Sequence, residues 1–594
     1  MKKRVADIIM EILCENNITD CFSIVGGGAM HLNNAFAICD KINKVFNHHE
    51  QACAMAAEAY ARASGRLAVV CVTSGPGGLN TLTGVEGAWV DSLPMLIMSG
   101  QVRYETSIEY TGLPLRIRGV QEFDIVHSVS NMTKYVKLVK DPLSIKYELH
   151  KAIDIAMSGR RGPVWLDIPL DVQSAVIEED DMYQVEKGIT TIPSATDTDI
   201  IDLLNLLNEG QRPCILTGSG IRASDTVAEF REFIDGLKIP IVGGALQADI
   251  LYSNCPLYYG MSGNIGPRTG NFILQNADVI LVLGNSLSYK QTGFNQKDFA
   301  PNAIIVMVDI DDNEPRKPGL NINRFIHSDL KCFFDKFKQE YTAEISANSD
   351  WLNYCNMLKG KFSAYESVKE INEMERVPIA YFWQQFSNKE KLDSVIALGN
   401  SNCVCTRLQS GIQFPEQRVL ANYGCGSMGD DLPEAIGAAI ATKKEVYCVT
   451  GDGSVMLNLQ ELQTIVHYNL PIKIIVFSNE GYGAIRQTCK NYFNGKYIGC
   501  DKESGVSFPD FEKIANAFDL PFCRCHNNSE LDECIDWINK QNGYAFLEIM
   551  QKLNDPIEPR VMSRMDENNK FLAPAIHDMY PFLDKKEINE LMLN

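Results

Sequence analysis

The sequence predicts an α/β protein with three doubly wound domains, each built around a parallel sheet. Its 594 residues exceed what a single hydrophobic core usually supports, so we expect about three domains. Apolar runs of strand length occur at 446–449 and 472–477, and the segment between them has the length and composition of a helix. A strand, a helix and a second strand in this order form the βαβ unit of a parallel sheet.

The chain divides into three predicted domains and a tail. The domains are residues 1–175, residues 195–345 and residues 376–555, and the tail is residues 556–594. Polar stretches predict linkers at about 178–199 and 345–375. The tail carries Arg560 and Arg564, and we expect it to fold over the functional site as a lid.

Several elements can be predicted within these domains. The first domain opens with apolar residues at helical spacing between Val5 and Leu13, which predicts an amphipathic helix. In the central domain, apolar runs at 278–284 and 304–311 predict parallel strands. The first and third domains are expected to resemble each other.

Composition restricts the classes of function. A net charge of −20 excludes a nucleic-acid partner, because phosphate binding requires a basic face. The chain contains no apolar stretch long enough to span a membrane and no cationic–apolar leader, so we expect no membrane association and a cytoplasmic location. Its 18 cysteines are typical of free thiols in a reducing compartment.

The third domain contains a predicted metal and diphosphate site. Gly451-Asp452-Gly453-Ser454 follows one predicted strand, and Asn479-Glu480-Gly481 follows the next. The carboxyl ends of neighbouring parallel strands form the edge where open α/β sheets bind ligands. A carboxylate and an amide oxygen suit Mg²⁺, which takes its other ligands from phosphates and water. A lone Gly-Asp-Gly is usually only a turn, and its pairing with Asn479 and Gly481 favours a ligand site.

The first third of the chain carries a second set of motifs. His48-His49-Glu50-Gln51-Ala52 precedes an alanine-rich segment with strong helix propensity, and a predicted strand then leads into a tight loop from Thr73 to Asn80. This order resembles the pyrimidine-binding domain of the acetolactate synthase (acetohydroxyacid synthase) group of thiamine diphosphate enzymes. The resemblance spans about residues 1–560 and includes segments 93–102, 121–125, 424–429 and 451–462.

This resemblance implies that thiamine diphosphate and Mg²⁺ are the cofactors. It further implies a pyrimidine-binding first domain, a central Rossmann-like domain and a diphosphate-binding third domain. In the family the cofactor bridges two subunits, so the resemblance implies a homodimer or a tetramer. Glu50 would hydrogen-bond the aminopyrimidine ring and favour its imino tautomer, which activates the thiazolium carbon. An apolar setting would raise the pKa of this carboxyl.

The residues implied by the resemblance fall into three sets. The catalytic set is Glu50, Gln121 and His31. The metal ligands are Asp452, Asn479 and the main-chain carbonyl of Gly481. The cofactor contacts are Gly28, Ser74, Pro76, Asn80, Asn400, Ser401, Gly426, Met428, Gly451, Asp452, Gly453, Ser454, Asn479 and Gly481. Asn400 and Ser401 replace a Gln-His pair of the relatives, Met428 would support the bent cofactor, and Asn458 would lie near the reactive centre.

Some segments depart from the family pattern. The glycine loop Val25 to His31 carries a histidine that would face the acceptor or, equally, pack as a helix residue. Asp430-Asp431-Leu432-Pro433-Glu434 is more acidic than the usual version, and a solvated helix entrance is the favoured explanation. The segment Gly284 to Lys290 lacks the arginines and aspartates that hold a flavin in acetolactate synthases, so binding of FAD stays open.

The resemblance implies a carboligase that decarboxylates a 2-oxo acid, with pyruvate the expected donor, and transfers the two-carbon unit to a carbonyl acceptor. The paired histidines of simple decarboxylases are absent near Gln121, where the neighbours are Gly119, Val120 and Glu122. A non-oxidative 2-oxo acid decarboxylase is the alternative, and a non-catalytic cofactor-binding relative is a further one. The chain also resembles a subgroup suspected of roles in sugar or surface-polysaccharide biosynthesis.

Overall fold

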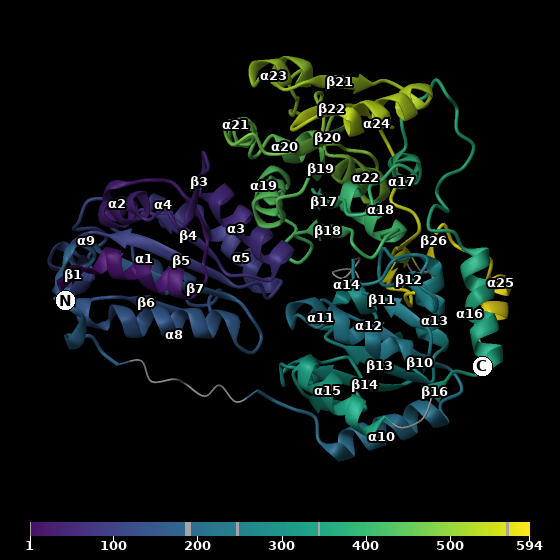
Figure 1. Ribbon diagram of the computed structural model, residues 1–594. Coiled ribbons are helices and arrows are strands. Elements are labelled where there is room, and N and C mark those ends of the chain that lie inside the picture. Colours follow the sequence, from purple (N-terminus) through teal and green to yellow (C-terminus); the bar gives the residue numbers. More distant parts are fainter. Residues whose placement is uncertain (1, 185–191, 245–248, 342–344, 566–569, 594) are drawn as a thin grey trace.

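A computed structural model of the protein describes residues 2–184, 192–244, 249–341, 345–565 and 570–593. Within these ranges the chain forms three six-stranded sheets whose neighbouring strands are all parallel, and helices flank each sheet. The predicted fold class is therefore confirmed. Figure 1 shows the first domain on the left, the third domain at the top and the central domain at the lower right.

The first domain contains a sheet with strand order β3-β2-β4-β5-β7-β6. Its strands are β2 (Asp20–Ser23), β3 (Asn43–Phe46), β4 (Ala68–Val72), β5 (Met95–Gln101), β6 (Tyr135–Leu138) and β7 (Pro163–Pro169). The helices that matter most below are α1 (Val5–Glu15), α2 (Met30–Ile38), α3 (Glu50–Ser64) and α5 (Leu82–Val90). Strand β4 is apolar and wholly buried, as expected of a strand covered by helices on both faces. The predicted opening helix is confirmed as α1.

The third domain repeats this arrangement. Its strand order is β18-β17-β19-β20-β22-β21, which corresponds position by position to the order in the first domain. The strands are β17 (Val395–Leu398), β18 (Arg418–Ala421), β19 (Val446–Gly451), β20 (Ile472–Ser478), β21 (Phe522–Cys525) and β22 (Ala545–Met550). Helix α21 (Glu461–His467) connects β19 to its parallel neighbour β20, which confirms the predicted βαβ unit.

The central domain has the strand order β12-β11-β9-β13-β14-β15, which is the order of a dinucleotide-binding sheet. Its strands are β9 (Pro213–Thr217), β11 (Ile241–Gly243), β12 (Tyr258–Met261), β13 (Val279–Leu283), β14 (Ile304–Asp309) and β15 (Arg324–His327). Strands β13 and β14 confirm the two predicted strands. The expectation of a polar linker after residue 345 is wrong for helix α16 (Ser349–Lys361), because the Trp351 indole donates to the Pro213 carbonyl over 3.0 Å and anchors the helix.

The tail lies along the central domain rather than over the third domain for much of its length (Figure 1). Arg268 donates to the carbonyl oxygens of Met579 and Pro581, and Asn271 donates to that of Ile576 over 2.8 Å. Helix α25 (Lys585–Leu591) follows. The antiparallel pair of β24 (Arg564–Met565) and β25 (Phe571–Leu572) instead reaches the third domain, where the Phe571 ring contacts Tyr492. The start of the tail also contacts the third domain, where Gln409 donates to the Pro559 carbonyl over 2.9 Å, so the lid prediction applies to these two parts of the tail.

Helices α3 and α19 (Asp431–Thr442) join the first domain to the third (Figure 1). A Cβ atom added to Gly437 would lie 2.0 Å from the Ala56 carbonyl oxygen, so the two backbones touch directly. Residues from both domains form one hydrophobic cluster, which includes Ala56 and Ala57 of α3 and Ala435 and Ile436 of α19. In the part of the chain that the structure describes, no helix is both long and apolar enough to cross a membrane.

Candidate functional site

The candidate site in the third domain lies at the carboxyl edge of its sheet. Strands β17 and β19 are neighbours although β18 separates them in sequence, so the chain reverses its direction of winding between them. Such a reversal opens a crevice in which α/β proteins bind ligands. Gly399-Asn400-Ser401 follows β17, and Asp452 follows β19, so both loops lie at this edge of the sheet.

Asp452 is the central residue of the predicted metal-binding site. Its Oδ2 atom accepts hydrogen bonds from the backbone N–H of Asn479 over 2.9 Å and of Gly481 over 3.3 Å. Burial raises the pKa of Asp452 to about 7, and the backbone N–H donors oppose this shift only in part. The structure therefore brings the three predicted metal-binding residues together around a desolvated carboxylate.

The segment after β20 is held firmly around Asn479. The Asn479 side-chain amide donates to Gln551 Oε1 over 3.0 Å, which leaves its oxygen toward Arg486, 3.3 Å from Nη2. Gly481 has a φ of +154°, and a Cβ there would lie 2.0 Å from the Cys500 carbonyl oxygen, so only glycine fits.

The charge and the open backbone of these residues suit a magnesium ion and the diphosphate group that it would bind. Within the described residues, the Asp452 carboxylate is surrounded by backbone N–H donors and forms no salt bridge, and a divalent ion would supply a positive charge. A Cβ added to Gly451 would meet no atom within 4 Å, so a ligand can approach this backbone closely. Oxygen donors from a carboxylate, an amide and a main-chain carbonyl suit Mg²⁺.

A small cavity of about 120 Å³ lies at the loop after β17 and is lined by Asn400, Ser401 and Gly426. The Asn400 side-chain amide donates to the Ser427 carbonyl, which ties the two predicted cofactor segments together. Gly426 has a φ of +69°, a conformation that favours glycine. Met428 is half-buried beside it. The structure thus gathers four of the predicted pyrimidine and diphosphate contacts.

Glu50 is the first residue of α3, and its carboxylate is half-buried in a single chain. His49 caps the helix, because its Nδ1 accepts the Gln51 N–H over 3.0 Å. Asn80 donates from its side-chain amide to Glu50 Oε2 over 3.0 Å, so these two predicted residues are in contact. In the described part of the chain, the Glu50 side chain makes no hydrogen bond other than this one.

The glycine loop and the Ser74 loop pack closely in the first domain. The Gly28 N–H donates to Thr73 Oγ1 over 2.9 Å, and a Cβ on Gly28 would lie 2.7 Å from Ser74 Oγ. Gln121 lies beside the same loop, because a Cβ on Gly75 would meet its carbonyl oxygen at 2.2 Å. Pro76 opens the short helix that contains Asn80. Five predicted residues therefore surround one edge of the first sheet: Gly28, Ser74, Pro76, Asn80 and Gln121.

His31 is the predicted residue that the structure does not join to this group. It lies in α2, and the pKa of its imidazole is lowered, first by partial burial and then by the charge of Arg4. Arg4 precedes α1 and lies outside the set of predicted site residues. The alternative of a packed helix residue agrees with this setting.

The acidic segment Asp430, Asp431 and Glu434 is buried, so the expectation of a solvated helix entrance is wrong. Asp430 and Glu434 belong to a charged cluster at the interface of α3 and α19, whose other members are Glu58, Arg62 and Asp91. Arg62 lies 2.5 Å from Glu58 and 2.7 Å from Asp91. Burial raises the pKa of Glu58 to about 7 and raises those of Asp430 and Glu434.

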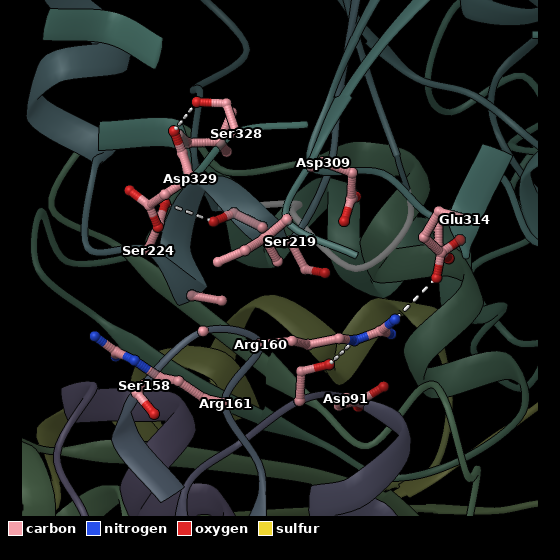
Figure 2. Close-up of a pocket in the computed structure, with 18 of the residues that line it drawn as sticks. Asp91, Ser158, Arg160, Arg161, Ser219, Ser224, Asp309, Glu314, Ser328 and Asp329 are labelled. Atoms are coloured by element: carbon pink, nitrogen blue, oxygen red, sulfur yellow. Dashed lines mark hydrogen bonds and ion pairs between the residues drawn. The ribbon is translucent and has the colours of Figure 1, made fainter. Parts of the chain in front are cut away.

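A larger cavity of about 270 Å³ lies between the first and central domains (Figure 2). It lies beside the carboxyl ends of β9, β13, β14 and β15, where the central sheet reverses its winding. Six serines, together with Asp309 and Asp329, line it. Arg160 and Arg161 approach from the first domain, and Arg160 is paired with Asp311 and Glu314 at 2.9 Å each.

Sequence reasoning missed the charged cluster and its link to the site. One feature of the sequence could have indicated this cluster. Glu58 and Arg62 stand four residues apart in an otherwise alanine-rich helix, a spacing that allows an ion pair. It also missed Glu461, which accepts the His48 N–H over 2.9 Å and an Asn47 amide N–H over 2.8 Å, thereby fixing the approach to Glu50 from the third domain.

Comparison with known proteins gives matches along most of the chain. Three family models match: the N-terminal TPP-binding domain of thiamine pyrophosphate enzymes at residues 3–127, their central domain at 200–331 and their C-terminal TPP-binding domain at 398–549. Rice acetolactate synthase 1 (chloroplastic) is 31% identical over 573 residues, which cover 94% of this chain and 86% of the relative.

Two further relatives show the same extent of similarity. The probable acetolactate synthase large subunit of Methanococcus aeolicus is 30% identical over 556 residues, with 89% of each chain covered. The large subunit of acetolactate synthase isozyme 2 from Escherichia coli strain K12 is 28% identical over 550 residues, covering 92% of this chain and 95% of the relative.

Proposed function

This chain belongs to the thiamine pyrophosphate enzyme family, and from that premise we propose that it is an acetolactate synthase-like carboligase that decarboxylates a 2-oxo acid, with pyruvate as the donor, and transfers the two-carbon unit to a carbonyl acceptor. The observation that carries the proposal is the convergence of Asn479 and Gly481 on the buried Asp452 carboxylate, in a chain that also carries Glu50 at the start of α3.

The third domain would hold the charged end of the cofactor. Asp452, Asn479 and the Gly481 carbonyl would bind Mg²⁺, and the Gly453 N–H and Ser454 hydroxyl would face the diphosphate. Asn400 and Ser401 would contact the diphosphate, and Gly426 and Met428 would contact the aminopyrimidine from the same side. Thiamine diphosphate, when bound, supplies a nucleophilic carbon and stabilises the carbanion left by decarboxylation.

Glu50 would act on the opposite side of the aminopyrimidine. Its carboxyl would hold a proton at the ring nitrogen, and Asn80 would keep that carboxyl oriented through its amide N–H. We propose that Glu50 and Asp452 of each site come from different chains of a homodimer, so that the partner covers the Glu50 carboxyl and removes it from water. A tetramer would contain two such dimers.

The residues near Gln121 favour transfer of the two-carbon unit to a carbonyl acceptor over release of an aldehyde. A simple decarboxylase needs an acid beside the carbanion, and the candidate near Gln121 is Glu122. Both oxygens of Glu122 are engaged with backbone N–H groups: Oε1 with Ile108, and Oε2 with Gly119 over 2.9 Å. This carboxylate therefore folds its own loop, which supports transfer of the two-carbon unit to a carbonyl compound.

The larger cavity, between the first and central domains, fits a ligand that carries a sugar ring and phosphates. Serine hydroxyls, Asp309 and two arginines line it (Figure 2). FAD has these parts, and the absorption spectrum of the purified protein tests for it. The segment Gly284 to Lys290 lacks the arginine- and aspartate-rich pattern of flavin-binding relatives. No step of the proposed reaction depends on this ligand.

The experiment that tests the proposed function is a product analysis. The protein is incubated with pyruvate, thiamine diphosphate and Mg²⁺, and carbon dioxide, acetaldehyde and acetolactate are measured. We expect carbon dioxide with little free aldehyde, formed faster when a second carbonyl compound is added. Candidate acceptors are 2-oxo acids, aldehydes and keto sugars, the last because of a suspected role in sugar or surface-polysaccharide biosynthesis.

Acetaldehyde in amounts equal to carbon dioxide would instead identify a non-oxidative decarboxylase. No turnover with any 2-oxo acid, despite tight cofactor binding, would identify a non-catalytic relative. Either result would overturn the proposed carboligase.

A further inference from the structure

The acidic segment at the start of α19 contains one residue that faces the cofactor loop rather than the charged cluster. Asp431 is fully buried. Its Oδ2 atom accepts a hydrogen bond from the Thr450 hydroxyl, and the Ser454 hydroxyl is its second partner. Thr450 and Ser454 stand immediately on either side of Gly451-Asp452-Gly453.

Ser454 links this carboxylate to a second segment. Its Oγ atom accepts the Gly429 N–H over 3.0 Å, so its own proton is free to bond Asp431. Gly429 follows Met428, which is one of the expected contacts of the aminopyrimidine. One carboxylate thus connects both ends of the diphosphate loop, and through Ser454 it also reaches the pyrimidine segment.

The loop after β17 meets the same carboxylate. A Cβ on Gly399 would lie 2.9 Å from Thr450 Oγ1 and 3.2 Å from Asp431 Oδ2, so the backbone beside Asn400 packs directly against this pair. Three segments that the proposed function assigns to the cofactor therefore meet at Asp431. No other acidic side chain of the cluster makes these contacts: Glu434 lies one turn further along α19 and faces Arg62, 3.9 Å away.

We propose that Asp431 is a positioning residue that fixes the diphosphate–metal loop in its binding shape, an inference that rests on the proposed function. A hydrogen-bonded loop loses less conformational freedom when a ligand binds, so a preorganised loop binds more tightly. Asp431 does not touch the cofactor itself and acts through Thr450 and Ser454. Its contribution should consequently appear in cofactor affinity rather than in the rate of the loaded enzyme.

The test compares Asp431→Asn with Thr450→Val, which removes the partner hydroxyl at nearly constant volume. Affinity for thiamine diphosphate is measured by calorimetry at saturating Mg²⁺, and kcat is measured at saturating cofactor. The Asp431 oxygens accept from the Thr450 hydroxyl and from the Leu432 N–H, and asparagine replaces one of them by an uncharged amide nitrogen that cannot accept a hydrogen bond. We expect each variant to bind the cofactor about tenfold to a hundredfold more weakly, the effect on the order of one charge-assisted hydrogen bond, with kcat nearly unchanged.

A double variant tests whether Asp431 and Thr450 act together, and a matched variant of the same helix serves as the control. Because Asp431 and Thr450 act through one bond, the double variant should bind little more weakly than either single variant. Glu434→Gln removes a buried carboxylate from the same helix that lies against Arg62 and the Leu398 backbone rather than against Thr450, and it should bind the cofactor as the wild type does. If Asp431→Asn does not fold, Thr450→Val carries the same prediction, because Thr450 is not among the proposed cofactor contacts.

Wild-type affinity in Asp431→Asn and Thr450→Val would overturn the positioning role and leave the proposed function standing. An equal loss of affinity in Glu434→Gln would also overturn it, since the effect would then belong to the helix as a whole. A wild-type protein that binds no thiamine diphosphate with Mg²⁺ would overturn the proposed function, and the positioning role with it.

Discussion

Asn80 donates a hydrogen bond to Glu50 across 3.0 Å, and this contact joins the loop after β4 to the first turn of α3. Glu50→Gln keeps the shape of the side chain but cannot exchange a proton with a ring nitrogen. We expect this variant to bind thiamine diphosphate normally and to lose about 100-fold to 1,000-fold in kcat. Asn80→Ala should cost much less, about threefold to tenfold, because it only frees the carboxyl to rotate.

Steady-state rates and calorimetric affinities for both variants check this pair of predictions. A Glu50→Gln enzyme with wild-type kcat would remove Glu50 from the catalytic set. Loss of binding in the same variant would make it a binding residue instead.

A heterodimer experiment tests the assignment of Glu50 and Asp452 to different chains. Chains carrying Glu50→Gln are coexpressed with chains carrying Asp452→Ala, and the heterodimer is isolated through two affinity tags. If each site takes one residue from each chain, one of the two sites is intact, so we expect about half of the wild-type rate.

The reciprocal heterodimer provides the control. It pairs a wild-type chain with a chain that carries both substitutions, and each of its sites then contains one defect. It should be nearly inactive. The reverse pattern, an inactive first heterodimer and a half-active second one, would place both residues of a site in a single chain.

The contact between α3 and α19 should tolerate no added atom at Gly437. A methyl group there would press on the Ala56 carbonyl at 2.0 Å, and two packed helices must separate to relieve it. We expect Gly437→Ala to destabilise the protein by about 1–3 kcal/mol, measured as a lower thermal midpoint. Gly360→Ala is the control, because its Cβ meets no atom within 4 Å and alanine favours the helix by about 0.5–1 kcal/mol. Equal midpoints for the two variants would contradict the prediction.

Glu58 should make stability depend on pH. Burial raises its pKa from an ordinary 4.5 to about 7, so the folded protein holds this proton more tightly than the unfolded chain does. The resulting stability is fully present below about pH 4.5 and is lost as the pH rises toward about 7, which amounts to about 3 kcal/mol. Glu58→Gln does not titrate, so its thermal midpoint relative to the wild type should rise between pH 5 and pH 8 in cofactor-free protein.

An exposed residue serves as the control for this titration. Glu533→Gln makes the same chemical change on the surface of α24 (Leu531–Lys540), and its midpoint should follow the wild type at every pH. Parallel curves for wild type and Glu58→Gln would show that the Glu58 proton does not contribute to stability.

The sequence sufficed for much of the fold and for the loops of the site. Apolar runs ending in glycine and polar residues predicted β19, β20 and the Asp452 and Asn479 loops, because strand burial and loop polarity are local properties. Helix α16 was missed because its buried stripe is narrow, consisting of Trp351, Cys355 and Leu358 among polar neighbours.

The buried acids could not be predicted from one sequence. Charged residues are almost always exposed, and the exceptions depend on partners brought together by the fold. Glu58 and Glu434 lie in different domains, and only the contact of α3 with α19 places both beside Arg62. The role of Asp431 depends on Thr450 in the same way, because the pairing exists only once β19 has taken its place in the sheet.

The first and third sheets share one strand order, and their functional loops occupy corresponding positions. The Gly28 loop follows the first strand of its sheet as the Asn400 loop does in the other, and the Ser74 loop corresponds in the same way to the Asp452 loop. One backbone plan thus serves two proposed ligand types, a heterocycle beside the first sheet and a metal-bound anion beside the third, and the loop residues supply the difference.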